Sequence, residues 1–156
     1  MRRNDREITV KAEIIDVLSR CDTIRIGMRG KEYPYVVPVS FGVETTDGLP
    51  IVFFHCAKEG LKVDLIKEDP NVCVEGDVFI KAERTARGIT ARYESVIGFG
   101  RCAWLTDPAD VLHGLTVITR HYDDGFAVES CPGLDRLLVG RITLGSLTGK
   151  RNLPVL

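Results

Sequence analysis

The stretch that decides the fold reads YPYVVPVSFGV over residues 33–43. Successive side chains of a strand point to opposite faces, and one face here is entirely apolar: Tyr35, Val37, Val39, Phe41 and Val43. The other face carries small or stiff residues, among them two prolines. Proline has no N–H to donate, so this side of the strand cannot be fully paired. The segment is therefore either an edge strand protected by proline or an open shelf for a planar ring, and both interpretations stay open.

Other segments extend this strand into an antiparallel sheet. Residues 23–29 alternate apolar and polar, and the turn at 45–48 leads into an apolar strand at 51–57. Three strands linked by short turns favour antiparallel pairing over a doubly wound parallel sheet. We expect further strands at 72–80, 92–105 and 139–147. Six strands with few helices bury their edges best by closing into a barrel.

Three helices are expected beside the sheet. The first runs over residues 5–19 with Asn4 or Asp5 as its cap, and the second covers 60–68. The third begins at Asp107-Pro108, a cap followed by proline, and ends near Tyr122. The polar, glycine-containing ranges 81–90, 123–125 and 131–133 are expected to be loops.

The bulk composition describes an ordinary globular chain. With 156 residues, 44% hydrophobic and 28% charged, it suits one domain over residues 1–156. A net charge of −1 does not provide the positive field that nucleic acid or an anionic membrane attracts. Residues 1–7 are charged and lack an apolar signal segment, and no run approaches a membrane span, so we expect a cytoplasmic protein. Five scattered cysteines predict free, mostly buried thiols.

The common catalytic and metal motifs are missing. Residues 145–150 are one residue short of a P-loop, and Gly98-Phe99-Gly100 has no third glycine or following helix. His55, His113 and His121 lack ligand spacing among themselves or with cysteine, so no metal site is predicted.

An anion site is the clearest chemical signal in the sequence. The strand 51–57 leads directly into a helix through Lys58-Glu59-Gly60-Leu61-Lys62. Free N–H groups, the helix dipole and two ammonium groups all favour a phosphate there. Glu59 would compete with that phosphate, and an ordinary solvated helix start is the alternative. On the strand 92–105, Ser95 shares a face with Tyr93 and Ile97 and could bond a ligand edge, although strand serines are usually just solvated.

Together these segments resemble the pyridoxamine 5′-phosphate oxidase-like FMN-binding split-barrel superfamily, and within it most resemble the nitroimidazole-resistance branch. The resemblance rests on residues 1–7, 34–42, 54–62, 93–101 and 147–150, which occur in the family's order over nearly the whole chain. It implies a mainly β (α+β) fold, a six-stranded antiparallel split β-barrel with flanking helices. One departure is Leu61, which stands where family members often have lysine.

The resemblance also implies a cofactor and a site. The protein would be a homodimer with FMN in two equivalent clefts between subunits. The isoalloxazine ring would lie against Val37-Pro38-Val39-Ser40, the phosphate near Lys58 and Lys62, and Ser95 near the ring or ribityl chain. Further cofactor contacts are expected at His55, Cys56 and Ala57. His55 is the candidate catalytic residue, with a purely structural role in seating the flavin as the alternative.

The leading function is flavin-dependent reduction of a small planar acceptor, such as a nitroaromatic compound, by an unknown reduced donor. Two rivals remain: a non-catalytic FMN- or haem-binding module, and a structural dimerising barrel without cofactor. Other branches of the superfamily bind deazaflavin or haem, so the fold alone does not decide the ligand.

Overall fold

The computed structural model describes residues 3–123, 125–130 and 133–154. Asp124, Cys131 and Pro132 lie outside the described residues, so the loops expected at 123–125 and 131–133, and the thiol of Cys131, are described only in part or not at all.

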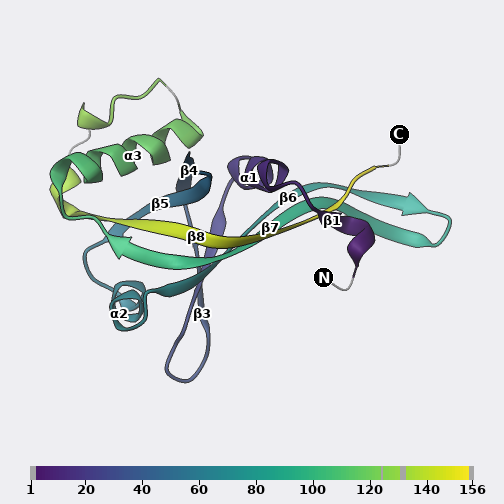
Figure 1. Cartoon of the computed structure of the whole chain (residues 1–156), viewed down its shortest axis with the longest axis horizontal. Coiled ribbons are helices and arrows are strands. Elements are labelled where there is room, and N and C mark those ends of the chain that lie inside the picture. The colour runs from purple at the N-terminus through teal and green to yellow at the C-terminus, as the bar shows by residue number, and fades with distance from the viewer. Residues whose placement is uncertain (1–2, 124, 131–132, 155–156) are drawn as a thin grey trace.

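One antiparallel sheet forms the framework (Figure 1). Its strands are β1 (Glu7–Ile8), β2 (Ile24–Met28), β3 (Tyr35–Val39), β4 (Phe41–Thr46), β5 (Leu49–Ala57), β6 (Asn71–Thr85), β7 (Gly88–Trp104) and β8 (Leu137–Asn152). The strand order is β3-β2-β6-β7-β8-β5-β4, and β1 pairs with β8. The two end strands of this order, β3 and β4, are consecutive in the chain. The chain therefore crosses directly from one edge of the sheet to the other, as in a split barrel, and the predicted fold class is confirmed.

The single strand expected over 33–43 is two strands, and this break, with β1, accounts for the extra strands beyond six. Val39 pairs with Ile24 of β2, whereas Phe41 pairs with Phe54 of β5. The chain changes partner at Ser40, which belongs to neither strand. Periodicity did not reveal this break, because the inward-facing residues on both sides of it are apolar.

The helices are α1 (Lys11–Ser19), α2 (Leu61–Glu68) and α3 (Pro108–Tyr122), with short 3-10 turns η1 (Asn4–Arg6), η2 (Val128–Ser130) and η3 (Leu134–Arg136). The second and third helices match the prediction. Asp107 caps α3 by accepting from the N–H of Ala109 at 2.8 Å. The prediction of a helix from Asp5 was wrong, because Ile8 pairs with Gly149 as part of β1 and is buried there.

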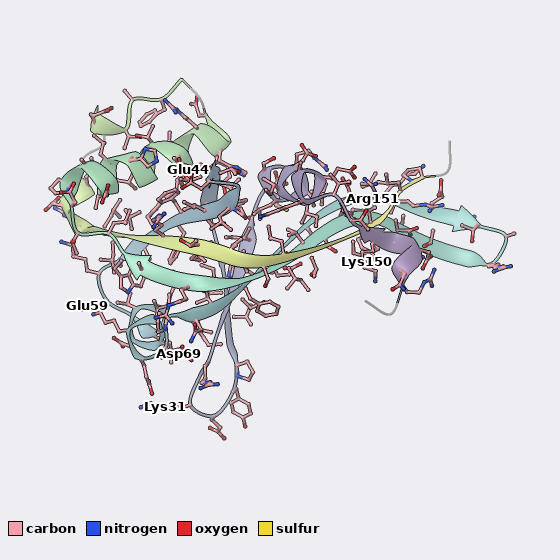
Figure 2. The ribbon with its side chains drawn as sticks, viewed as in Figure 1. Lys31, Glu44, Glu59, Asp69, Lys150 and Arg151 are labelled. Atoms are coloured by element: carbon pink, nitrogen blue, oxygen red, sulfur yellow. The ribbon has the colours of Figure 1, made fainter. Side chains whose placement is uncertain are left out.

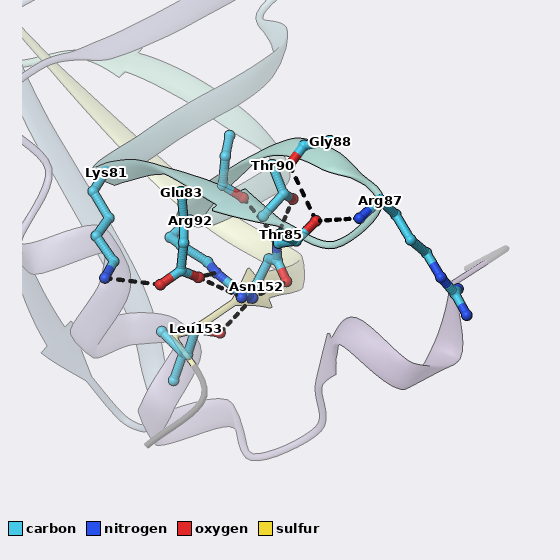
Figure 3. A network of polar contacts seen from close by, with 10 residues as sticks. Lys81, Glu83, Thr85, Arg87, Gly88, Thr90, Arg92, Asn152 and Leu153 are labelled. Atoms are coloured by element: carbon cyan, nitrogen blue, oxygen red, sulfur yellow. Dashed lines mark hydrogen bonds and ion pairs between the residues drawn. The ribbon is translucent and has the colours of Figure 1, made fainter.

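The prediction of a loop at 81–90 was also wrong. Residues 71–85 and 88–104 form one long hairpin, the β6–β7 arm, which extends past the rest of the sheet with β1 and the end of β8 (Figure 1). Arg92 holds the arm to β8 by donating to Asn152 Oδ1 at 3.1 Å and to the Leu153 carbonyl at 2.8 Å (Figure 3). The sequence of the arm is polar because solvent reaches much of the arm, not because its strands lack pairing partners.

Two apolar clusters fill the molecule. The larger occupies the barrel, where Phe54, Ile24 and Ile142 are completely buried. The smaller lies beneath α3, where Leu115 and Ile118 pack with Phe53. Helix α3 thus covers the outside of β5 (Figure 1), and the side chains of the larger cluster fill its inside. Residues 50–54 of β5 are buried between them, and its end at residues 55–57 emerges at the surface.

Candidate functional site

The site begins where β3 separates from β5. Pairing between β4 and β5 stops at Phe41 and Phe54, but pairing between β5 and β8 continues to Ala57 and Leu137. The end of β5 therefore has a strand neighbour on one side only within the described residues. Strand β3, which among the described strands pairs with β2 alone, faces the same gap with its own free edge.

A cavity of about 470 Å³ lies in this gap, and we call it the split pocket. Its lining residues are Pro38, Val39, Ser40, His55, Cys56, Ala57, Lys62 and Leu137. Two unpaired strand edges offer backbone N–H and C=O groups to a ligand, apart from the N–H that Pro38 lacks. Cavities of a few hundred cubic ångströms with apolar walls and few polar groups are typical of small-molecule sites.

Helix α2 begins beside this pocket and leaves its first turn open. Gly60 precedes the helix with φ 134° and ψ 165°, a conformation that other residues rarely adopt, and no side chain caps the N-terminus. Lys62, in the first turn, is half-buried and lines the split pocket, with its Nζ 5.9 Å from the centroid of the Phe54 ring. Helix dipole and ammonium charge therefore act on the same cavity, which is suited to an anion.

Burial and the charge of Lys62 shift the pKa values of two titratable groups that line the pocket. The pKa of His55 is lowered, first by burial of the ring and second by the nearby ammonium group of Lys62. Burial raises the pKa of the Cys56 thiol, and Lys62 opposes that shift. At neutral pH the imidazole is therefore neutral and the thiol is protonated, so Lys62 is the charged side chain of this cavity.

Seven of the ten predicted site residues line the split pocket: Pro38, Val39, Ser40, His55, Cys56, Ala57 and Lys62. Val37 lies beside them on β3, but its side chain packs against the barrel core, which leaves its backbone to face a ligand. Leu137 lines the pocket and was missed, because the last strand was expected to start at Val139. The apolar pair Leu137-Leu138 was the available signal.

Ser95 lies away from the split pocket in the structure. It sits opposite Asp77 on β6 and Lys150 on β8, and β2 and β6 separate its strand from β3 in the sheet. Figure 2 places Lys150 beside the β6–β7 arm, on the side of the molecule away from Glu59 and helix α2. Ser95 does not line the split pocket of its own chain.

Lys58 lines a different cavity from Lys62. We call it the α3 pocket: about 710 Å³, bounded by α3 and by the segment that leads into β8. It adjoins the split pocket, since Leu137 lines both. The two lysines that the sequence assigned to one phosphate thus line different pockets.

A third hollow, about 740 Å³, lies on the outer face of the sheet and contains neither His55 nor Lys62. Phe99, Cys73 and Gly27 line it, and Val36 continues the row on β3. Exposed fractions of 58% for both Phe99 and Val36 make this an apolar surface rather than an enclosed site. Within the described part of the chain, no group of three or more His, Cys, Asp or Glu residues could hold a metal ion.

Comparison with known proteins agrees with this geometry. The family model for pyridoxamine 5′-phosphate oxidase matches residues 10–151, which include the whole split pocket. The chain belongs to this family. No curated protein matches the sequence. Among the residues that the structure describes, no helix is long and apolar enough to cross a membrane.

Solved structures of several members of this fold are similar. A proposed 5-nitroimidazole antibiotic resistance protein from Bacteroides thetaiotaomicron has a TM-score of 0.82 at 27% identity, covering 92% of this chain and 85% of that one. A FAD- and haem-binding protein from Mycobacterium smegmatis has a TM-score of 0.77 at 17% identity, covering 97% and 76%. A FAD-binding protein from Mesorhizobium loti has a TM-score of 0.65 at 20% identity, covering 94% and 97%. The last two show the shared split-barrel fold.

Proposed function

We propose that this pyridoxamine 5′-phosphate oxidase family member binds the FMN moiety of a flavin in the split pocket and reduces small planar acceptors, such as nitroaromatic compounds. The observation that carries the proposal is the meeting of two free strand edges with the open start of α2 and the ammonium group of Lys62 in one cavity. The similarity to the Bacteroides protein supports the acceptor class.

Different residues of the split pocket bind different parts of the flavin. Pro38 on β3 and Ser40 directly after this strand offer a flat surface for a ring, because neither carries a bulky branched side chain. Lys62 and the first N–H groups of α2 hold the phosphate. When bound, a flavin supplies transfer of electrons between a reduced donor and the acceptor. Neutral His55 at the pocket mouth orients the acceptor by a hydrogen bond, from either ring nitrogen as donor or acceptor.

A homodimer is part of this proposal. Exposed apolar residues cluster on the outer face of β3, β6 and β7, and large exposed apolar patches typically mark interaction sites. Ser95 shares that face and is remote from its own split pocket, so it meets a flavin only if a second copy brings it there. Dimer formation would also exclude water from the two pockets. Four free cysteines in the described chain support a reducing compartment, and we place the protein in the cytoplasm.

The first experiment is the absorption spectrum of the purified full-length protein, with mass measurement of any ligand released on denaturation. We expect flavin bands in the protein as isolated or after addition of FMN, and reduction of a nitroaromatic compound when a nicotinamide donor is supplied. A protein that stays colourless with added FMN contradicts the proposal. Bound flavin without turnover, or a Soret band, favours instead the non-catalytic flavin or haem module.

Lys62→Ala tests the anion site itself. Loss of a charge-assisted hydrogen bond of about 1.5–3 kcal/mol corresponds to FMN binding roughly 10- to 100-fold weaker, with riboflavin affinity unchanged because riboflavin has no phosphate. Lys67→Ala is the matched control, since Lys67 is exposed in the last turn of the same helix and does not line the pocket. Equal losses for FMN and riboflavin would contradict a phosphate role for Lys62.

A further inference from the structure

The α3 pocket is a cavity that the proposed function does not use. Its volume of about 710 Å³ lies within the range of small-molecule sites. Neither His55 nor Lys62 lines it, and no residue of β3 does. The ligand that fits this pocket is therefore decided by its own walls and charges.

The walls of the α3 pocket are aliphatic and incompletely covered. The aliphatic residues that line it are Leu105, Val111, Leu112, Leu115, Leu134, Leu137 and Leu138. Leu115 is buried, whereas the other six are half-buried and keep part of their apolar surface exposed. A ligand with an apolar group covers this surface and removes it from water, which is favourable.

Three charged side chains line the same pocket, and they come from three separate segments. Lys58 lies between β5 and α2, Glu129 lies in η2 and Asp135 lies in η3. Among the described residues, none of these three side chains forms an ion pair or a hydrogen bond. The ammonium group of Lys58 attracts a carboxylate, and the two carboxylates attract an ammonium group.

This combination of charges discriminates between classes of small ligand. A phosphate or a simple carboxylate is attracted by Lys58 but repelled by Glu129 and Asp135. A simple amine is attracted by the two carboxylates but repelled by Lys58. A zwitterion pairs with charges of both signs. An α-amino acid with an apolar side chain carries both charges at one end and an apolar group at the other, which matches the pocket.

We propose that the α3 pocket binds an apolar α-amino acid, as a ligand separate from the flavin. The apolar side chain of the ligand packs among the aliphatic walls. Its carboxylate pairs with Lys58, and its ammonium group pairs with Glu129 and Asp135. This inference goes beyond the proposed function and does not depend on flavin binding in the split pocket.

The test compares three probes that share one phenylethyl group and differ only in charge. L-Phenylalanine carries both charges, phenethylamine carries the ammonium group alone, and 3-phenylpropionate carries the carboxylate alone. Isothermal titration calorimetry with the full-length protein measures their affinities. We expect L-phenylalanine to bind at least roughly fivefold more tightly than either analogue, because only the zwitterion gains both ionic contacts.

Charge variants assign each end of the ligand. Lys58→Ala should weaken L-phenylalanine and 3-phenylpropionate by roughly three- to tenfold, and leave phenethylamine unchanged or tighter. The double variant Glu129→Gln with Asp135→Asn should weaken L-phenylalanine and phenethylamine to a similar extent, and leave 3-phenylpropionate unchanged or tighter. Lys67→Ala and Asp110→Asn are the matched controls, since both residues are exposed and neither lines the pocket.

Leu112→Trp fills the pocket and should abolish binding of all three probes. If circular dichroism shows that this variant does not fold, the charge variants decide alone. The inference is overturned if no probe binds, if L-phenylalanine binds no more tightly than its analogues, or if the charge variants change all three affinities equally. Flavin absorbance of the same preparation is recorded separately, so the loss of one proposal leaves the other standing.

Discussion

The hydroxyl group of Tyr122, the last residue of α3, accepts a hydrogen bond of 3.1 Å from the backbone N–H of Phe41, the first residue of β4. The same hydroxyl donates to the carbonyl of Asp22 at 2.9 Å. Phe41 directly follows Ser40, where the chain crosses between the edges of the sheet. Tyr122 therefore holds the corner from which the split pocket is built, from a helix more than eighty residues away in sequence.

Tyr122→Phe should weaken that corner. The partly buried Phe41 N–H loses its partner, which costs about 1–3 kcal/mol. The Asp22 carbonyl also loses its partner, but it lies in an exposed contact and can bond water instead. We expect the free energy of unfolding to fall by roughly this amount, with weaker FMN binding because Ser40 is less fixed. Denaturant titration and FMN titration measure the two effects. Tyr33→Phe is the control, since Tyr33 is 72% exposed, and identical behaviour of the two variants would refute the role of Tyr122.

The lowered pKa of His55 predicts a pH dependence of stability. The unfolded chain has an ordinary histidine pKa of about 6.5, so between that value and the lower folded value the unfolded state binds the additional proton. The free energy of unfolding should therefore fall as the pH drops through about 6.5 and level off below the folded pKa. Above pH 7 the effect vanishes, because both states are deprotonated.

His55→Gln isolates this contribution. The unfolding free energies of wild type and variant are measured from about pH 4.5 to about pH 8, a range that brackets histidine titration. The difference between the two curves removes the effects common to both proteins. One of these is the contact between His113 Nε2 and Glu44 Oε2 at 2.9 Å, which the substitution leaves in place. Curves that run parallel over this range would show that the folded protein does not shift the pKa of His55.

Phe99→Arg tests the proposed dimer. A charge placed in the exposed apolar row of Phe99 and Val36 should separate two copies, because a buried unpaired guanidinium group is strongly unfavourable in an interface. We expect light scattering to give the mass of two chains for the wild type and the mass of one chain for the variant. The variant should also lose its flavin. Leu49→Arg, at an exposed position at the start of β5, should remain dimeric. A wild-type protein with the mass of one chain, or a Phe99→Arg variant with the mass of two chains, contradicts this interface.

Local signals predicted much of the fold. Asp107 followed by proline predicted the start of α3, and it caps the helix as expected. Alternation predicted β2, where Ile24 and Ile26 are buried and Arg25 is exposed. The helix after β5 was predicted from Leu61 and Leu65, one turn apart, and from Asp69-Pro70 at its end, because these signals act over a few residues. Most of the pocket followed, since residues 38–40 and 55–57 belong to two short continuous segments.

The errors arose where distant pairing overrides the local pattern. Ile8 fits an apolar helix stripe but pairs with β8, and the range 81–90 is polar although all of it except the turn at 86–87 is paired in the arm. The break at Ser40 is of the same kind, since β2 and β5 select different parts of one apolar run.

The sequence by itself determined the strands and helices whose side chains alternate or cap within a few residues, and it placed a cation at the first turn of α2. Only the tertiary structure decided that Lys58 and Lys62 line separate pockets, and that Ser95 lies away from both. The physical reason is that a side chain's local pattern sets which face it occupies, whereas the neighbour across that face is chosen by pairing between strands far apart in the chain.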